Sequence, residues 1–96
     1  MSETASRTAR LQAALTRAFS PTALHVVDES AHHAGHAGAG PNGETHYAVL
    51  LVSPAFRGMG RLARSRAVHA VLGAEFAAGM HALSLTLRTP EEHSVA

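Results

Sequence analysis

The sequence predicts an α+β fold, in which the order helix–strand–strand–helix–strand forms a three-stranded sheet with its helices on one face. Two segments with apolar residues at helical spacing, and three short segments with alternating apolar residues, indicate this order. The chain has 96 residues, of which 46% are hydrophobic, enough for one modest core. We therefore expect a single domain over residues 1–96, with its core at about 5–89 and a loose tail at 90–96.

The two helices are predicted from apolar stripes. The first runs from about Thr4 to Phe19, and it ends at Ser20-Pro21 because the residue before a proline is pushed out of the α region. Its stripe consists of residues four apart, namely Leu11, Leu15 and Phe19. The second helix spans Arg61 to Ala78, followed by Gly79 as a C-terminal cap. Its apolar face would hold Leu62, Val68, Val71, Leu72 and Phe76.

Three segments alternate as strands do: Ala23 to Asp28, Thr45 to Ser53 and His81 to Arg88. We expect the first two to pair as an antiparallel hairpin. The third returns after a crossover helix, which favours a parallel connection. The middle segment is apolar on both faces, which is typical of a strand that is central or buried on both sides.

Glu29 to Glu44 separates the first two strands and has no periodic pattern. It is rich in glycine and carries three of the eight histidines. Loops longer than about 12–15 residues are uncommon in compact domains and are usually functional or disordered. This segment is therefore the first place to look for a site.

The composition excludes several classes of function. The chain has no cysteine, which removes disulfides, thiol catalysis and thiolate ligands. Its net charge of +1 is too small for nucleic-acid binding by bulk charge alone. Neither a nucleophile elbow nor a Walker-type phosphate loop occurs, and the adjacent Asp28 and Glu29 would point to opposite faces of a strand. We expect a binding module and not an enzyme.

No segment predicts membrane insertion or export. No apolar run approaches the roughly 20 residues that a spanning helix needs. The polar N-terminus does not resemble a signal peptide. We therefore expect a cytoplasmic protein without membrane contact, and the sequence leaves open whether the chain forms a weak homodimer.

Several short motifs, in their joint order, resemble those of the BolA family. They are Val26-Val27-Asp28-Glu29-Ser30, Gly35-His36, Gly43-Glu44-Thr45-His46-Tyr47, Val52-Ser53, Phe56-Arg57-Gly58, Arg64-Ser65-Arg66 and His81-Ala82-Leu83. The resemblance runs from about Ala5 to Glu91. It implies a fold similar to the class II KH domain, a monothiol glutaredoxin as partner and a bridging [2Fe–2S] cluster. Some bacterial members are described as DNA-binding transcriptional regulators.

The resemblance places His81 at the family's cluster-ligating histidine. Two histidines can replace two cysteines on one iron of a [2Fe–2S] cluster. A cysteine-free chain would therefore supply the histidine half, while a glutaredoxin cysteine and glutathione supply the rest, and the isolated chain would bind no cluster. The second ligand would come from the long loop, where His36 and His33 compete. Because ligation needs neutral imidazoles, cluster binding should weaken below a pH of about 6.5.

A rival metal hypothesis is a zinc site made by His32, His33 and His36 with His81. His46 opens the central strand, where we expect it to order the base of the loop or to hydrogen-bond a neighbour.

Four arginines near the second helix form another candidate site, for nucleic acid or for an acidic partner: Arg57, Arg61, Arg64 and Arg66. The family usually has Arg-His-Arg where this chain has Ser65 in the middle, so the resemblance implies no imidazole role at that position. Gly58 and Gly60 are one residue too close for the Gly-x-x-Gly clamp of KH domains. The KH route to RNA is therefore disfavoured.

Overall fold

The computed structural model describes residues 6–29 and 45–95. Its elements follow the predicted α+β order, with two short helical segments added and the second helix divided in two. They are α1 (Arg7–Phe19), β1 (Ala23–Asp28), β2 (His46–Val52), the 3₁₀ turn η2 (Pro54–Phe56), α2 (Arg61–Val71), α3 (Gly73–Ala77), β3 (Ala82–Arg88) and α4 (Pro90–Val95).

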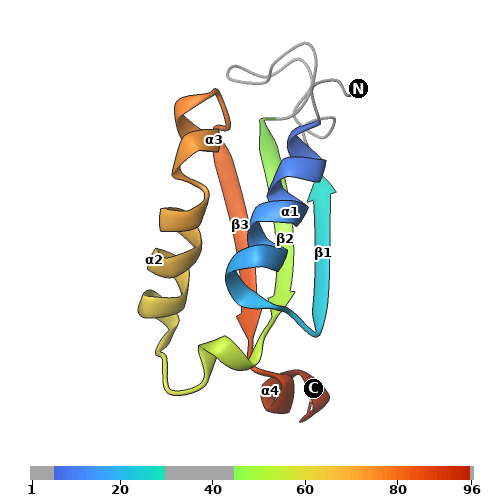
Figure 1. Ribbon diagram of the computed structural model, residues 1–96, viewed down its shortest axis with the longest axis vertical. Helices are drawn as coiled ribbons and strands as arrows, with labels where there is room; N and C mark the ends of the chain where they lie inside the picture. Colours follow the sequence, from blue (N-terminus) through green and yellow to red (C-terminus); the bar gives the residue numbers. More distant parts are fainter. Residues whose placement is uncertain (1–5, 30–44, 96) are drawn as a thin grey trace.

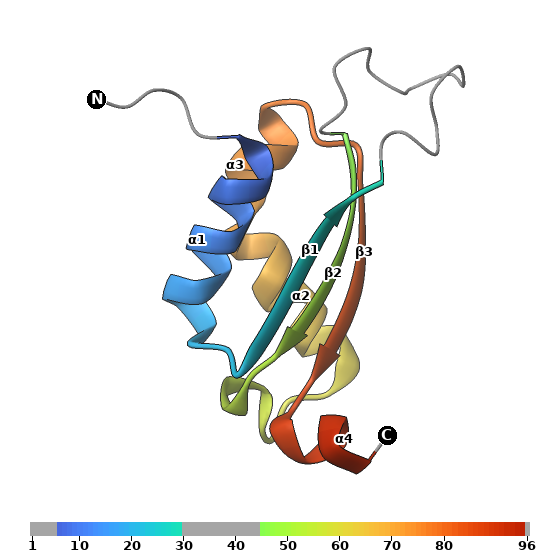
Figure 2. The same ribbon diagram turned by 90° about the vertical axis from the view of Figure 1, so that its right-hand side faces the viewer.

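The three strands form one sheet in the order β1-β2-β3. β1 is antiparallel to β2, and β3 is parallel to β2, so both predicted pairings are confirmed. α1, α2 and α3 lie on the same side of the sheet, and within the described residues no helix covers the other side (Figures 1 and 2). α4 follows β3 at the end of the sheet far from α3 (Figure 1).

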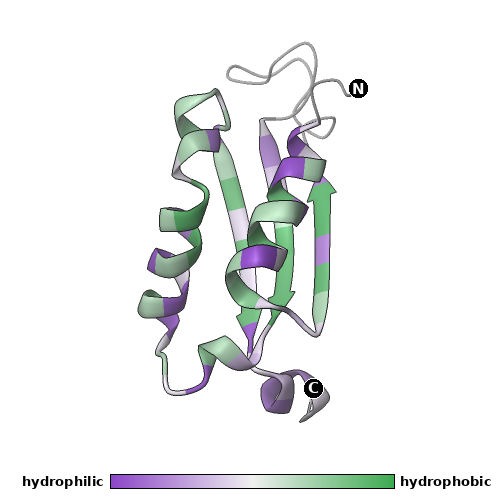
Figure 3. Cartoon of the chain, in the orientation of Figure 1, coloured by the Kyte–Doolittle hydropathy of each residue, from purple (hydrophilic) through white to green (hydrophobic). Residues whose placement is uncertain are grey.

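The core lies between the sheet and α1 and α2. The side chains of β2 that face the helices are buried, with partly buried leucines and valines of β1 and β3 packed beside them: Tyr47, Val49 and Leu51, with Leu24, Val26, Leu83, Leu85 and Leu87. β2 is central, as predicted, but its other face is only half-buried. Figure 3 shows the result, with mostly hydrophobic strands and a hydrophilic α4.

Helix α1 shows the predicted stripe and extends it by one residue. Ser6 caps the helix, because its Oγ accepts a hydrogen bond from the backbone N–H of Ala9 at 3.1 Å. The predicted start at Thr4 lies outside the described residues. Arg7 precedes Leu11 by four residues and therefore joins the buried stripe.

The second predicted helix is interrupted. α2 ends at Val71 and α3 begins at Gly73, because Leu72 departs from helical geometry with φ −99° and ψ 12°. The predicted apolar face is also only partly right: Val68 and Leu72 are buried, whereas Leu62 is 62% exposed. Leu62 precedes Val68 by six residues, which at 3.6 residues per turn places it about 120° around the helix.

The predicted loose tail at 90–96 is wrong for residues 90–95, which form α4. The missed signal is a capping box that begins at Thr89. The backbone N–H of Glu92 donates to Thr89 Oγ1 at 3.1 Å, and the N–H of Thr89 donates to Glu92 Oε1 at 2.9 Å. Pro90 at the first helical position strengthens the start, since its missing N–H is not needed there.

Candidate functional site

His81 stands at the entrance to β3, and its backbone is fixed against β2. The N–H groups of His81 and Ala82 both donate to the carbonyl oxygen of Thr45, at 2.8 and 3.1 Å. The side chain of His81 is exposed. A rigid backbone with an exposed imidazole is the arrangement that a ligand to a shared metal centre requires.

His46 lies beside His81. The two ring centroids are 5.9 Å apart, with the planes inclined by 69°. Nδ1 of His46 is 2.8 Å from Oγ1 of Thr45, in line with the expected hydrogen bond to a neighbour. The pairing of these two histidines was not predicted from the sequence. The signal was available, because each opens a strand and the two strands were predicted to be parallel.

The predicted loop ligands His33 and His36, and the zinc candidate His32, lie outside the described residues. The segment that carries them leaves the sheet after Glu29 and rejoins it at Thr45. The N–H of Glu29 donates to the carbonyl oxygen of His46 at 2.8 Å, so both ends of the segment are anchored next to the His46–His81 pair. Within residues 6–29 and 45–95, no three potential ligands converge on a metal position.

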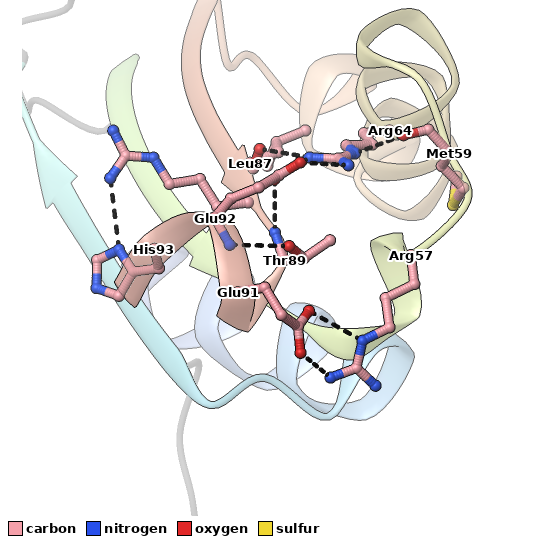
Figure 4. A network of polar contacts seen from close by, with 9 residues as sticks. Arg57, Met59, Arg64, Leu87, Thr89, Glu91, Glu92 and His93 are labelled. Carbon is pink, nitrogen blue, oxygen red and sulfur yellow. Dashed lines mark hydrogen bonds and ion pairs between the residues drawn. The ribbon is translucent and has the colours of Figure 1, made fainter. Parts of the chain in front are cut away.

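The four candidate arginines fall into two groups. Arg57 and Arg64 are engaged by glutamates of α4 (Figure 4). Arg57 binds both oxygens of Glu91, at 3.0 and 2.5 Å. Arg64 binds both oxygens of Glu92, at 2.6 and 3.1 Å.

Arg64 is held more firmly than Arg57. It also donates to the carbonyl oxygens of Met59 at 2.8 Å and Leu87 at 3.2 Å, and only 13% of its side chain is exposed, against 58% for Arg57. Its guanidinium therefore joins the turn before α2, the end of β3 and helix α4. This is mainly a structural role.

The two ion pairs shift the pKa values of the glutamates and arginines that form them. The hydrogen bond from Arg57 is the largest cause of the lowered pKa of Glu91. The hydrogen bond from Arg64 lowers the pKa of Glu92 to about 2. In return, hydrogen bonds to these glutamates raise the pKa of Arg57 and of Arg64. All four groups are charged at neutral pH, and each pair is internally compensated.

Arg61 and Arg66 differ from those two, since both are exposed on α2. Neither has a salt bridge to another described residue. The structure therefore does not bring the four arginines together as one free cationic patch. Arg57 also precedes α2 instead of lying at helical spacing within it.

Fold and site together define a small, cysteine-free α+β domain with a histidine pair at the base of its longest connection. Comparison with known proteins agrees with this class, because residues 15–92 match the family model described as BolA-like protein. The chain belongs to the BolA family.

Relatives and solved structures support the assignment. The chain is 43% identical over 88 residues to a protein from Sinorhizobium described as an uncharacterized protein in the cobS 5′ region, with 91% of this chain and 95% of the relative covered. It is 41% identical over 91 residues to SufE-like protein 1, chloroplastic/mitochondrial, of Arabidopsis thaliana, covering 91% of this chain. The structure of BolA1 from Arabidopsis thaliana matches with a TM-score of 0.83 at 38% identity, covering 94% of this chain and 98% of that one.

Some of these relatives are much longer than this chain, which spans 24% of SufE-like protein 1 and 55% of the chloroplastic protein BOLA1 of Arabidopsis thaliana. Of the helices in residues 6–29 and 45–95, none has the length and apolar character needed to cross a membrane.

Proposed function

We propose that this protein is a non-enzymatic adaptor that binds a monothiol glutaredoxin and shares a [2Fe–2S] cluster with it, in cluster trafficking or iron regulation. His81 is the first ligand from this chain, and His36 or His33 is the second. The glutaredoxin cysteine and glutathione supply the sulfur ligands, and cytoplasmic residence is part of the proposal. The cluster is cargo held between two proteins and not a resident cofactor of this chain.

The observation that carries the proposal is the exposed His81 on a fixed backbone, at the point where the histidine-rich segment is anchored. The donor chemistry fits, because imidazole nitrogens can replace thiolates on one iron of a [2Fe–2S] cluster and this chain has no cysteine. His46, next to His81, is placed to orient that ring or to line the cluster's surroundings. Family membership is consistent with such an adaptor.

Co-expression with a monothiol glutaredoxin in the presence of glutathione tests the proposal. The wild-type chain should yield a coloured heterodimer with the visible absorption of a [2Fe–2S] cluster. His81→Ala should lose the colour or bleach at least tenfold faster, because one iron loses a ligand. His36→Ala and His33→Ala, measured separately, identify the second ligand.

A matched control is His25→Ala. His25 is also exposed and lies in a strand, but it is in the middle of β1, away from the histidine pair. It should leave the colour and the bleaching rate unchanged. A wild-type chain that forms no complex with the glutaredoxin, or a His81→Ala complex as stable as the wild type, would contradict the proposal.

The alternative function, a DNA-binding transcriptional regulator, stays a prediction. The pairing of Arg57 and Arg64 with α4 leaves Arg61 and Arg66 as the exposed cations for phosphate contacts. If they bind DNA, the logarithm of the binding constant should fall linearly with the logarithm of the salt concentration. Arg61→Ala should make this slope shallower, and His81→Ala should leave it unchanged. A gel-shift series at several salt concentrations distinguishes this function from the adaptor.

A further inference from the structure

A groove of about 910 Å³ runs between α2 and β3 and has no part in the proposed function. Its floor is aliphatic and its α2 wall is polar. The floor is formed by Leu83, Leu85 and Leu87, and the wall by Arg61, Arg64, Ser65 and His69. The wall residues Arg61, Ser65 and His69 recur every four positions and so form one line along the helix.

The floor of this groove is the edge of the sheet. β3 pairs with β2 on one side and, among the described residues, with no strand on the other. Along a strand with a parallel neighbour, the backbone N–H and C=O groups of one residue point toward that neighbour, and those of the next residue point away from it. The carbonyl oxygen of Arg88 accepts from the N–H of Ser53, and that of Leu87 accepts from Arg64. The backbone groups of Leu83 and Leu85 therefore face outward along the groove, as does the N–H of Leu87.

The outward backbone groups of β3 recur at every second residue, which is the spacing at which an added strand forms its hydrogen bonds. Leu83 and Leu85 each present one donor and one acceptor, and Leu87 adds a donor. A partner strand of four or five residues, about 15 Å long, would match them. The guanidinium of Arg64 covers the Leu87 carbonyl, so it closes the groove where β3 ends.

The charge of the groove is cationic near that closed end. Arg61, Arg64 and Arg88 line it together with one carboxylate, Glu92, which already pairs with Arg64. Two positive charges are therefore left over when histidine is neutral. Arg61 is exposed, and the Arg88 guanidinium has no salt bridge to a described carboxylate; its Nη1 lies 3.4 Å from Nδ1 of His93.

We propose that this groove binds an extended acidic segment of a partner protein, which adds to β3 as a fourth strand. Backbone hydrogen bonds to Leu83 and Leu85 hold the segment, and its carboxylates lie toward Arg61 and Arg88. A nucleic acid fits less well, because no phenylalanine, tyrosine or tryptophan among the described residues lines the groove for base stacking and the floor is aliphatic.

The groove goes beyond the proposed adaptor function, and neither His46 nor His81 lines it. β3 runs from the turn after α3 toward α4 (Figure 1). The cationic end of the groove lies at the α4 end of that strand, where Arg64 bonds the Leu87 carbonyl oxygen and Arg88 is the last residue. The carboxylates of a bound segment would therefore lie at the end of β3 opposite the histidine pair.

Binding of a synthetic ten-residue peptide tests the inference. The peptide alternates valine and threonine and ends in two glutamates, and its counterpart ends in two lysines. With the full chain, NMR should show slowed amide exchange at Leu83 and Leu85 on addition of the acidic peptide. The lysine peptide should bind at least tenfold more weakly.

Leu85→Pro removes the outward N–H, at a site where an edge strand tolerates proline, and should weaken binding at least tenfold. Leu85→Ala is the control, because it loses the same side chain but keeps the N–H, and it should bind within about threefold of the wild type. Should Leu85→Pro fail to fold, Ser65→Trp fills the groove and should abolish binding. Ala70→Trp, at an exposed position of α2 outside the groove, should not.

Three results would overturn the inference. One is the absence of peptide binding to the wild-type chain. Another is amide protection that survives both Leu85→Pro and Ser65→Trp. The third is an oligothymidylate that protects the same amides more strongly than the acidic peptide, which would make the groove a nucleic-acid site.

Discussion

At the scale of single residues, one carboxylate joins α1 to α3. Glu75 of α3 accepts hydrogen bonds from Arg7 at 2.8 Å and from Arg10 at 2.8 and 2.9 Å. Arg7 also donates to the carbonyl oxygen of Ala78 at 3.0 Å. Only 14% of the Glu75 side chain is exposed, and the hydrogen bond from Arg10 is the largest cause that lowers its pKa to about 2.

We predict that Glu75→Gln lowers the free energy of unfolding by roughly 3 kcal/mol at pH 7, the energy equivalent of its pKa shift. The folded-state pKa lies below the ordinary value of 4.5, so the stabilisation is present above pH 4.5 and is lost as pH falls toward 2. Urea unfolding of both proteins at pH 7 and pH 3 checks this, since their difference should shrink at pH 3.

The control for this prediction is Glu91→Gln, which removes an exposed ion pair. Such pairs contribute little, because solvent screens them. The urea midpoint should therefore change little at pH 7. If Glu91→Gln lost as much free energy of unfolding as Glu75→Gln, burial would not explain the effect predicted for Glu75.

At the scale of elements, glycines shape the end of the second helical region. Gly73 begins α3 with a φ in the ordinary negative region, and an added Cβ there would meet open space. Gly79, by contrast, has φ +116° in the turn before β3, confirming the prediction that it ends the helical region. The same substitution should therefore have opposite effects at the two sites.

Gly73→Ala should stabilise the protein by roughly 0.5–1 kcal/mol, because alanine restricts the unfolded chain and favours helix. Gly79→Ala should destabilise it by more than that, since an L residue is strained at this φ. Thermal unfolding followed by circular dichroism measures both. A stabilising Gly79→Ala would show that the turn is not held at a positive φ.

Helix α4 depends on its first residues more than on its own length. A six-residue helix is marginal in isolation, and Thr89 provides its cap. We predict that Thr89→Ala costs roughly 1 kcal/mol of stability and speeds amide exchange at Glu92, whose N–H loses its acceptor. Thr89→Ser keeps the hydroxyl and should restore slow exchange. Unchanged exchange in Thr89→Ala would mean that the ion pairs alone hold α4.

At the scale of the whole molecule, polar contacts tie the helices to one another around a single core. The Arg7–Glu75 and Arg10–Glu75 pairs join α1 to α3, while Arg64–Glu92 joins α2 to α4. The histidine pair and the cationic end of the groove occupy opposite ends of β3. The molecule therefore presents two chemically different ends on one rigid sheet.

These pairs make acid sensitivity a property of the whole fold. The pKa values of Glu75, Glu91 and Glu92 are all lowered, so protonating them costs folding free energy. We expect the urea midpoint to be nearly constant from pH 7 to pH 5 and to fall steadily from about pH 4.5 toward pH 2. A urea midpoint that stays constant down to pH 3 would show that these ion pairs do not contribute to stability. Repeating the series in 1 M salt should reduce mainly the contribution of the exposed pairs.

Local sequence predicted the elements well, because side-chain periodicity reports on the backbone directly. The stripe of α1, the central position of β2 and both strand pairings follow from patterns within short windows. The family resemblance pointed to His81 as the leading site residue, and the structure places it exposed at the start of β3. The break at Leu72 and the capping box at Thr89 were also present in the sequence, as Gly73 and as Thr-Pro-Glu-Glu.

The remaining features depend on which residues meet in space. The burial of Arg7 needs Glu75, which is 68 positions away, and Arg64 finds Glu92 at a separation of 28. His46 meets His81 because parallel pairing brings the starts of two strands together, and the groove exists because α2 stands over an unpaired strand edge. Periodicity describes neighbours along the chain, so contacts between distant residues, and the charges they neutralise or leave free, were decided by tertiary packing alone.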